Sequence, residues 1–313
     1  MTTLIDVARR AGVSKSTVSN VIRGGALVAD ATRQRVERAI ADTGYRPNAI
    51  ARALKARTSK AIGVVVPDLT NIFYAELAVG VERAANTMGY ALLAAHTDCS
   101  PATEEEAARV LIERRVDGVV IGGASLGSSL PDLLLDRDIP VVLASFGEPE
   151  DARLGVVDHD DMAAMEEIVA HLYDLGHRRI AFVSQHLREY SGERRRLGLA
   201  GALGRRGLSL VALEDGPTAV VAHNDMHAIA TMDRLERKGL RVPQDVSVVG
   251  YDDVPLASHC RIKLTTVRSD AEVMGRRAVE LVVAAAREGR HVAHREMQSN
   301  PLVVRSTTQR PPA

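Results

Sequence analysis

Hydrophobic residues near the start of the chain recur at the spacing of short α-helices. The pattern predicts three helices, over 4–11, 16–22 and 32–43. Thr3 and Ser14 are suited to cap the first two helices, and Asp6 has the position of a capping-box partner for Thr3. Gly12 and Gly44 stand where the first and third helices are expected to end. Two short helices joined by a tight turn form a helix-turn-helix unit, whose second helix enters the major groove of DNA.

The segment after the third predicted helix has a different pattern. Pro47 prevents that helix from continuing, and Asn48 can cap a new short helix. This new helix has no apolar face wide enough to fold alone. We therefore expect conditional structure over residues 47–55, followed by a linker over 56–60.

From residue 61 onward, short apolar runs alternate with segments of helical periodicity. The runs predict strands over 62–66, 91–95, 118–121, 141–144, 179–184, 219–222 and 246–250. The predicted helices cover 71–88, 103–114, 129–138, 162–175, 193–206, 225–238 and 272–288. Short strands that are apolar throughout imply parallel sheets covered by helices on both faces. The length of this region suits two doubly wound α/β subdomains, with ligands at the carboxyl ends of the strands and in the cleft between the subdomains.

The overall charge of zero conceals a division between these regions. Residues 1–60 contain twelve Lys and Arg residues but only four Asp and Glu residues. Because the whole chain has 40 of each kind, the remaining residues have an equal excess of Asp and Glu. A basic head on an acidic body indicates that the head binds a polyanion. The alternative interpretation is a solvated helical surface rich in Arg.

The composition limits the possible classes of protein. The chain has 46% hydrophobic and 26% charged residues, which is typical of a globular protein. No apolar run approaches the roughly 18–20 residues that span a bilayer, and no apolar core of a signal peptide is present, so we expect no membrane association. The two cysteines, Cys99 and Cys260, provide no disulfide framework, which suggests a cytoplasmic protein.

Motifs of enzymes are not recognisable. The glycines of 122–127 lack the position and spacing of a dinucleotide fingerprint, and the sequence contains neither a Walker motif nor a nucleophile elbow. His159, Asp160 and Asp161 could suggest a metal, but adjacent residues rarely converge on one ion, and Asp160 suits a helix cap. We expect a protein that is not an enzyme and has no cofactor and no metal. A transport-type binding protein is the other alternative, and the basic head argues against it.

Several strings occur in a characteristic order. They are Leu4-Ile5-Asp6-Val7-Ala8, Gly12-Val13-Ser14, Thr17-Val18-Ser19, Gly44-Tyr45-Arg46-Pro47-Asn48, Ala51-Arg52-Ala53-Leu54, Val64-Val65-Val66-Pro67-Asp68, Asp117-Gly118-Val119-Val120, Gly176-His177-Arg178-Arg179-Ile180, Asn224-Asp225, Val248-Val249-Gly250-Tyr251-Asp252-Asp253 and Leu264-Thr265-Thr266-Val267. Through this ordered set the chain resembles the LacI/GalR family of bacterial transcription regulators over nearly its whole length. The resemblance implies a repressor that binds a pseudo-palindromic double-stranded DNA operator as a homodimer. It also implies hinge helices that fold on DNA, and a periplasmic-binding-protein-like core that binds a small-molecule effector of the sugar or nucleobase class.

The resemblance assigns DNA-contacting residues by position. Lys15, Ser16 and Asn20 match the positions that contact bases. The chemistry agrees, because Lys donates to guanine, Ser bonds to either type of base, and Asn pairs with adenine. The alternative for Lys15 and Ser16 is that they cap the helix and touch only phosphate. The expected phosphate contacts are Thr17, Ser19, Asn48 and Arg52.

Two further residues belong to the predicted hinge. Leu54 matches the leucine that the family inserts into the minor groove at the operator centre. The alternative is that Leu54 packs against its dimer mate, an apolar contact that paired hinge helices also need. Lys55 is placed to reach the groove or the flanking phosphates.

The implied effector-binding residues are Phe73, Tyr74, Ser145, Arg195, Asn224 and Asp252. Arg195 presents a fork of donors suited to the paired oxygens of a polar ligand, and Asp252 can accept from sugar hydroxyls or a base edge. Asn224 and Asp252 follow strands of the second subdomain, where such a sheet binds its ligand. Asp225 suits a helix N-cap as well as a ligand contact, and Asp253 suits a structural role.

The expected domains are a head over 1–46, a hinge over 47–60, a first subdomain over 61–157 and about 268–295, and a second over 158–267 and about 296–313. One segment departs from the family pattern, since residues 209–216 are too few for the strand and helix found there in relatives. We therefore expect the second subdomain to lack one strand-helix unit. In that case the helix over 193–206 leads directly into the strand over 219–222 by a right-handed crossover, and the strand over 179–184 becomes an edge.

Overall fold

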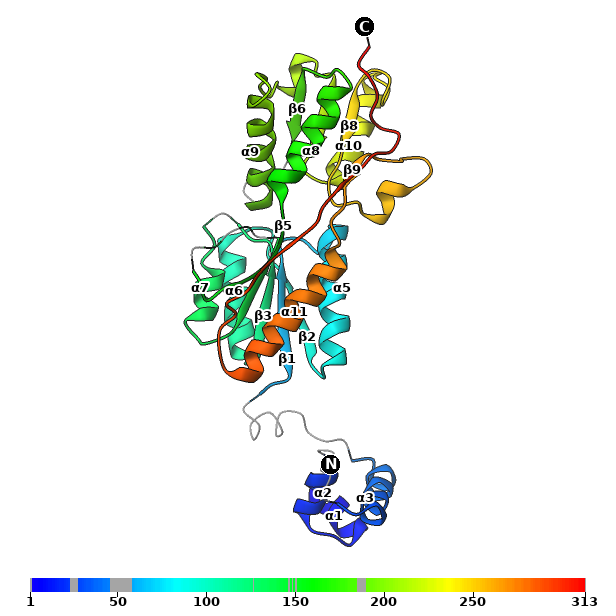
Figure 1. Cartoon of the computed structure of the whole chain (residues 1–313). Coiled ribbons are helices and arrows are strands. Elements are labelled where there is room, and N and C mark those ends of the chain that lie inside the picture. The colour runs from blue at the N-terminus through cyan, green and yellow to red at the C-terminus, as the bar shows by residue number, and fades with distance from the viewer. Residues whose placement is uncertain are drawn as a thin grey trace. The chain divides into compact units, whose positions relative to one another are not determined.

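The chain forms two units, which divide between Ser59 and Lys60 (Figure 1). We call the first unit the head and the second the core. The structure is a computed structural model that describes residues 2–22, 28–45, 58–125, 127–145, 147, 149, 151–184 and 190–312. Most of the predicted hinge lies outside these residues.

Three helices build the head: α1 (Leu4–Ala11), α2 (Lys15–Ile22) and α3 (Asp30–Thr43). The predicted capping box is confirmed, since the Thr3 hydroxyl accepts from the Asp6 N–H and the Asp6 carboxylate accepts from the Thr3 N–H. Gly12 and Gly44 end α1 and α3 in the left-handed conformation that glycine favours. The predicted head helices are confirmed, with α3 beginning at Asp30 rather than at residue 32.

The first subdomain contains a six-stranded parallel sheet in the order β10-β5-β4-β3-β1-β2. Its strands are β1 (Ala61–Val66), β2 (Ala91–His96), β3 (Gly118–Gly122), β4 (Val141–Ala144), β5 (Gly155–His159) and β10 (Arg295–Gln298). The helices α5 (Ile72–Thr87) and α11 (Ala271–Glu288) cover one face, and α6 (Pro101–Glu113) and α7 (Leu130–Leu135) cover the other. Val64 and Val65 of β1 are buried on opposite faces, which is why this strand is apolar throughout.

The second subdomain contains a three-stranded parallel sheet in the order β6-β7-β8. Its strands are β6 (Ile180–Val183), β7 (Ala219–Ala222) and β8 (Ser247–Val249). The helices α8 (Asp161–Asp174) and α9 (Tyr190–Gly204) pack on one face, and α10 (Asp225–Arg237) packs on the other. A short 3-10 helix, η2 (Pro255–Ser258), and an antiparallel pair of strands, β9 (Thr266–Val267) and β11 (Leu302–Val303), complete this half of the core.

The predicted alternation of strands and helices is confirmed throughout the core, with element ends shifted by a few residues. The strands β5 and β10, which pair with each other, are not among the predicted elements. They extend the first sheet to His159 and Gln298, beyond the boundaries expected at residues 157 and 295.

The connection from α9 to β7 differs from the direct crossover that the sequence suggested. α9 packs on the sheet face that contains Ile180 and Val221, whereas α10 packs on the opposite face with Val220. Since β6, β7 and β8 are parallel and follow one another across the sheet, two direct crossovers on opposite faces would have opposite hands. Left-handed crossovers are rare, so a direct path from α9 into β7 is disfavoured.

The chain takes another path through residues 208–216, which we call the edge segment. Leu210 forms a parallel bridge with Ile180, on the side of β6 away from β7. One 3-10 turn, η1 (Leu213–Asp215), then follows, and Leu213 packs with the α10 side of the sheet. The predicted direct crossover is therefore wrong. The strand β6 stands at the edge of the three-stranded sheet, as expected, and is bordered there by a single bridge and one 3-10 turn.

The helices α5 and α11 approach each other closely at two glycines. A Cβ atom on Gly80 of α5 would lie 2.2 Å from the carbonyl oxygen of Glu272, and one on Gly275 of α11 would lie 2.2 Å from that of Leu77. Both obstacles are backbone atoms, which cannot move aside as a flexible side chain could. Glycine at these positions therefore sets how closely the two helices pack.

We expect Gly275→Ala to lower the free energy of unfolding by about 1–3 kcal/mol, because overpacking outweighs the gain of up to ~1 kcal/mol that Ala brings to an exposed helix. The matched control is Gly201→Ala in α9, where the nearest atom to a new Cβ belongs to the Arg205 side chain at 3.6 Å. The control should be neutral or stabilising. Chemical denaturation measures both, and equal stabilities of the two variants would contradict the argument.

Candidate DNA interface and effector site

The second helix of the head has one apolar and one polar face. Val18 and Val21 of α2 are buried in the cluster that α1 and α3 complete. Ser16 and Asn20, one turn apart on the opposite side, are exposed, and so is Lys15 at the start of the helix. The helix therefore turns the three predicted base-contacting residues toward solvent, while its apolar side chains hold it in the head.

The start of α2 is fixed by Ser14. Its Oγ accepts from the Thr17 N–H at 3.1 Å and lies 2.7 Å from Ser16 Oγ. The Ser16 hydroxyl thus belongs to the helix cap, which supports the interpretation of Ser16 as a positional residue. Thr17 and Ser19 are half-buried beside the exposed residues. The other predicted DNA contacts, Asn48, Arg52, Leu54 and Lys55, lie outside the described residues and stay predictions.

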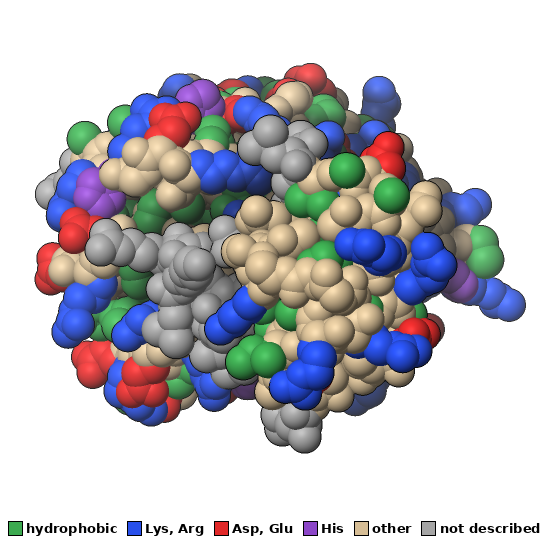
Figure 2. Space-filling view, turned by 90° about the horizontal axis from the view of Figure 1, so that it is seen from below, with side chains coloured by type: hydrophobic (Ala, Val, Ile, Leu, Met, Phe, Trp, Pro, Cys, Tyr) green, Lys and Arg blue, Asp and Glu red, His purple; other side chains and the backbone are tan. Residues whose placement is uncertain are grey.

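The surface of the head is basic. The described part of the head has six Lys and Arg residues against four Asp and Glu residues, and Figure 2 shows blue Lys and Arg side chains spread over the face that it draws. Two arginines are paired, Arg9 with Asp6 at 3.6 Å and Arg10 with Asp42 at 3.1 Å, and both pairs are exposed. Each pair has no net charge, so the head keeps the net positive charge that its excess of Lys and Arg produces.

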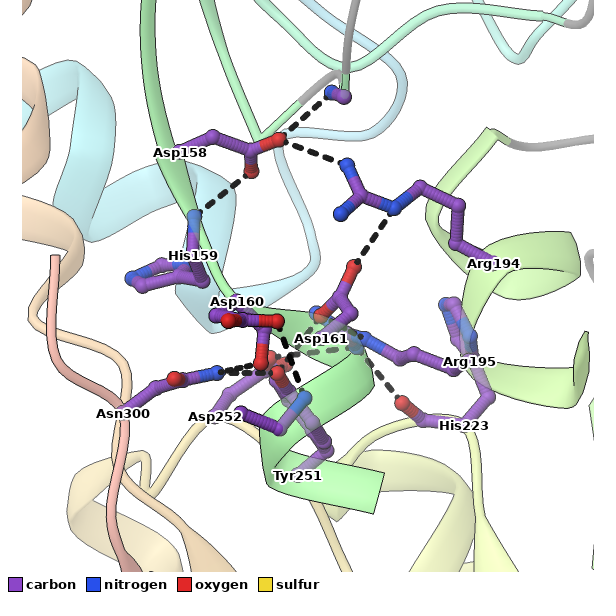
Figure 3. Close-up of polar contacts among 12 residues, drawn as sticks. Asp158, His159, Asp160, Asp161, Arg194, Arg195, His223, Tyr251, Asp252 and Asn300 are labelled. Carbon is purple, nitrogen blue, oxygen red and sulfur yellow. Dashed lines mark hydrogen bonds and ion pairs between the residues drawn. The ribbon is translucent and has the colours of Figure 1, made fainter. Parts of the chain in front are cut away.

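In the core, residues from both subdomains meet in a cluster of charged side chains (Figure 3). Arg195 of α9 is 3% exposed and lies at its centre. Its Nη1 donates to the His223 carbonyl at 2.7 Å and lies 3.6 Å from Asp252 Oδ1, while its Nε donates to Asp161 Oδ1 at 3.3 Å. The guanidinium lies over the Tyr251 ring, 3.5 Å from its centre. The predicted effector residues Arg195 and Asp252 are therefore brought together.

The cluster keeps Arg195 charged although it is buried. Burial alone would lower the pKa of Arg195, but the carboxylate of Asp161 and other neighbours more than offset it, so the pKa lies above its ordinary value. The Tyr251 hydroxyl donates to Asp161 Oδ1 at 2.6 Å and accepts from the Asn300 side-chain amide at 2.7 Å. Burial and the charge of Asp161 raise the pKa of Tyr251 well above its usual value, so it remains a neutral donor.

Asp158, at the end of β5, joins a second arginine to the cluster. Its Oδ2 accepts from the Gly147 N–H at 2.7 Å and from Arg194 Nη1 at 3.0 Å, and Arg194 Nε also lies 3.7 Å from Asp161 Oδ2. Burial, reinforced by the charge of Asp161, raises the pKa of Asp158 to about 6. The pKa of Asp158 thus lies well above that of an ordinary aspartate.

His159 stands beside this carboxylate with its ring buried. It is 1% exposed, and neither ring nitrogen has a hydrogen-bond partner among the residues that the structure describes. Burial lowers the pKa of His159 to about 4, so the ring is neutral at pH 7. Its centre lies 6.4 Å from that of the Phe73 ring.

The remaining predicted effector residues are also buried. Phe73 and Tyr74 begin α5 and pack edge to face, with ring centres 5.3 Å apart. Ser145 follows β4 and has a positive φ of 55°. Asn224 is the N-cap of α10, and its side-chain oxygen accepts from the His227 N–H at 2.9 Å. The Asn224 side chain therefore caps the N-terminus of α10.

Two neighbouring aspartates have structural partners. Asn224 rather than Asp225 caps α10, so the prediction of Asp225 as a cap is wrong. Asp225 is fully buried and accepts from Thr266 Oγ1 at 2.5 Å and from the Val254 N–H at 2.9 Å, and burial raises its pKa to about 7. Asp253 pairs with Arg268 and Arg305, at 3.0 and 2.6 Å, in the structural role that we expected.

Seven residues of the cluster were not among the predicted site residues: Asp158, His159, Asp161, Arg194, His223, Tyr251 and Asn300. The run of 156–161, two valines followed by Asp-His-Asp-Asp, carried a usable signal, because a short apolar strand that ends in polar residues before a helix marks the carboxyl edge of a parallel sheet. The prediction that Asp160 caps α8 is confirmed, since its Oδ1 accepts from the Ala163 N–H at 3.0 Å.

Within the described part of the chain, no group of three or more His, Cys, Asp or Glu side chains is arranged to hold a metal ion. None of the described helices is long and apolar enough to cross a membrane.

Models of known protein families match nearly the whole chain. Residues 3–48 match "Bacterial regulatory proteins, lacI family". Residues 59–212 match "Periplasmic binding proteins and sugar binding domain of LacI family", and residues 169–308 match a periplasmic binding protein-like domain.

Individual proteins agree with the family models. The chain is 33% identical to the HTH-type transcriptional repressor PurR of Photobacterium profundum, over 99% of each chain, and 32% identical to PurR of Vibrio atlanticus, over 98% of each. Among solved structures, a Lac repressor dimer bound to operator and the anti-inducer ONPF superposes with a TM-score of 0.88 at 26% identity, over 98% of this chain and 99% of that one. A complex of the regulator CelR with cellobiose superposes with a TM-score of 0.71 at 30% identity, over 98% and 100%.

His159 and Asp158 give opposite contributions to the pH dependence of stability. The pKa of His159 is about 4 in the folded protein, whereas an ordinary histidine has a pKa of 6.5. The unfolded chain therefore takes up the proton first, and the protein loses stability as the pH falls from about 6.5 to about 4. The pKa of Asp158 is about 6 in the folded protein, whereas an ordinary aspartate has a pKa of 3.8. The folded protein therefore takes up the proton first, and its stability increases as the pH falls from about 6.

We therefore expect His159→Gln to uncover the contribution of Asp158. When the pH is lowered from about 7.5 to about 5, the wild type loses the stability that the neutral His159 ring contributes, and the variant does not. Relative to the wild type, the free energy of unfolding of the variant should therefore increase by about 2 kcal/mol over this pH range. Urea denaturation at the two pH values measures this difference. The exposed His96 supplies the control, because His96→Gln should keep the wild-type profile, and an unchanged profile in His159→Gln would argue against a neutral, buried ring.

Proposed function

Since the chain belongs to the LacI family of bacterial transcription regulators, we propose that it represses transcription by binding a pseudo-palindromic operator as a homodimer, under the control of a small-molecule effector. The relatives are repressors rather than enzymes, and we propose no catalytic reaction. The site of action is the cytoplasm, where the operator DNA is found.

The observation that carries the DNA-binding part is the exposure of Lys15 and Asn20 on a helix whose other face is buried in a basic head. A helix held in this way can enter a major groove, where Lys donates to guanine and Asn pairs with adenine. Thr17, Ser19 and the hinge residues Asn48 and Arg52 would contact phosphates, and Leu54 with Lys55 would occupy the minor groove.

One head contacts too few base pairs to select a single site, so the proposal includes two chains on one operator. The dimer contact is assigned to α5 and α11, on which Val79 and Val273 are exposed at 41% and 37%. Two head units would then face successive major grooves of the operator.

The effector site is assigned to the charged cluster of the core, with Arg195 and Asp252 as polar contacts and Phe73 and Tyr74 as an aromatic wall. Ser145 and Asn224 complete the proposed set. Sugars and nucleobases both fit such a combination of aromatic faces and buried polar groups, and the relatives include a cellobiose-bound regulator and repressors named PurR.

The DNA-binding proposal predicts different effects for two head residues. Asn20→Ala should relax the preference at one base pair by roughly 1–3 kcal/mol, because the bidentate contact with adenine is lost. Arg52→Ala should weaken binding to all sequences alike, because a phosphate contact carries no sequence information. The operator is first selected from a randomised duplex library with the wild-type protein, and fluorescence anisotropy then compares its single-base variants.

Gln34→Ala, at an exposed position of α3, is the control for the folding of the head and should leave both properties unchanged. The logarithm of the binding constant should also fall with the logarithm of the salt concentration by about 0.9 for each neutralised phosphate. A flat salt response, or equal affinity for operator and scrambled DNA, would overturn the proposal.

The effector response generates a second prediction. The edge segment is shorter than the strand-helix unit expected from the family, and the PurR alignment extends over 333 positions, more than the 313 residues of the chain. The sequence alone suggests an open cleft there, but Arg195, Asn224 and Asp252 are 3%, 4% and 5% exposed. Arg195 already donates to Asp161 and the His223 carbonyl, so an effector has to compete with these internal contacts. An effector shifts a conformational equilibrium only through its difference in affinity for the two states. We expect DNA binding with weak or absent induction or corepression.

Titration of ribose, cellobiose, guanine and hypoxanthine into the operator complex measures this response. The competing outcome is that the edge segment or the dimer partner closes the wall of the site. A hundredfold change in operator affinity with any of these compounds, equivalent to ~2.7 kcal/mol of coupling, would show that the switch is intact.

A further inference from the structure

The helix α9 belongs to the second subdomain, but its first turn contacts the first. Its apolar residues Leu199 and Leu203 pack with α8 and the β6-β7-β8 sheet. At its start, the Tyr190 N–H donates to the carbonyl of Ala124, in the loop that follows β3, at 3.4 Å. One helix therefore carries residues that hold both halves of the core.

The Tyr190 ring lies directly against Gly147, in the loop that follows β4. A Cβ atom on Gly147 would lie 1.9 Å from a ring carbon of Tyr190, and Gly147 has a φ of +96°. Both the space and the backbone conformation therefore require glycine at this position. The Gly147 N–H donates to Asp158 at 2.7 Å, so the surface that receives the ring is itself held by the end of β5.

Arg194 makes the second contact, one turn further along α9. Its Nη1 donates to Asp158 Oδ2 at 3.0 Å, and the two side chains are 17% and 3% exposed. This ion pair joins the second subdomain to the first sheet and is shielded from solvent. Removing one partner of a shielded pair is costly, because the other charge remains buried without compensation.

We propose that Tyr190 and Arg194 of α9, with Gly147 and Asp158 of the first subdomain, form a latch that holds the two subdomains closed in the absence of any small molecule. The neighbouring Arg195 does not take part in the latch, because it donates to Asp161 and the His223 carbonyl and pairs with Asp252, all within the second subdomain. The contacts that bridge the cleft are those of Tyr190 and Arg194. An effector then acts by competing with the latch or by adding to it, and this last step rests on the proposed function.

The two native cysteines allow a direct test in the full chain. Cys99 follows β2 in the first subdomain, Cys260 lies after η2 in the second, and the sequence has no other cysteine. Spin labels on both, in protein diluted with unlabelled chains so that only distances within one chain are measured, report the separation of the subdomains by double electron–electron resonance. Without added ligand, the wild type should give one narrow distance distribution.

Three variants break the latch in different ways. Asp158→Asn removes the charge and keeps the size, Arg194→Gln removes the other partner, and Gly147→Ala displaces the Tyr190 ring without changing any charge. Each should broaden the distribution and shift it away from the wild-type maximum. Thermal melting checks folding, and if Gly147→Ala does not fold, the two charge variants decide the outcome.

The matched control is Glu166→Gln. Glu166 pairs with Arg205 and Arg206, within the second subdomain, so this variant removes an ion pair without touching the cleft. Its distribution should equal that of the wild type. A wild type that is already broad, or latch variants that keep the wild-type distribution, would overturn the proposal.

Operator binding is measured on the same samples, so that a failure of the proposed function can be distinguished from a failure of the latch proposal. A wild type that binds no operator would overturn the proposed function, while the distance distributions would still decide whether the latch exists.

Discussion

The core is organised around one buried positive charge. Arg195 is almost completely removed from solvent, and a guanidinium in that situation is tolerated only when carboxylates and carbonyl oxygens surround it. Asp161 comes from the start of α8, the His223 carbonyl from the end of β7, and Asp252 from the end of β8. These segments must therefore meet at one point. Tyr251 and Asn300 extend the requirement to the last part of the chain, because Tyr251 donates to Asp161 and Asn300 in turn donates to the Tyr251 hydroxyl.

The same carboxylates connect this charge to the contact between the two subdomains. Asp161 interacts with both Arg194 and Arg195, and Asp158 shares Arg194, so three aspartates and two arginines lie within one shielded network. The network has one carboxylate more than it has guanidinium groups, which agrees with the raised pKa of Asp158. A ligand that enters here competes with internal contacts. The energy that drives a conformational change is therefore the difference between its contacts and those of the protein itself.

The sequence predicts the regular elements well where a single physical signal decides them. Caps such as Thr3 and Asp160 and apolar runs such as β1 or β7 are local features, and the structure confirms them. β10 was not predicted, because Arg-Glu-Met-Gln has no apolar pattern and forms a strand only by pairing with β5. Asp158 and His159 were missed with β5, since their place in the cluster depends on that strand belonging to the first sheet. Arg195 and Asp252 could be assigned by resemblance, but their mutual pairing depends on tertiary contacts that spacing along the chain does not encode.

The edge segment shows how topology limits what a short insertion or deletion can do. α9 has to stay on the face of α8, because its leucines complete the same apolar cluster, and α10 has to cover the other face. With both helices fixed, a chain that went directly from α9 to β7 would make the rare left-handed crossover. Leu210 at the outer side of β6 and one turn of η1 restore the favourable hand with very few residues. The handedness of the connection therefore sets a minimum length for this segment. A family member can shorten the unit to a single bridge and a single turn, but removing that bridge would force α9 or α10 to change faces and expose the apolar residues that now hold the second subdomain together.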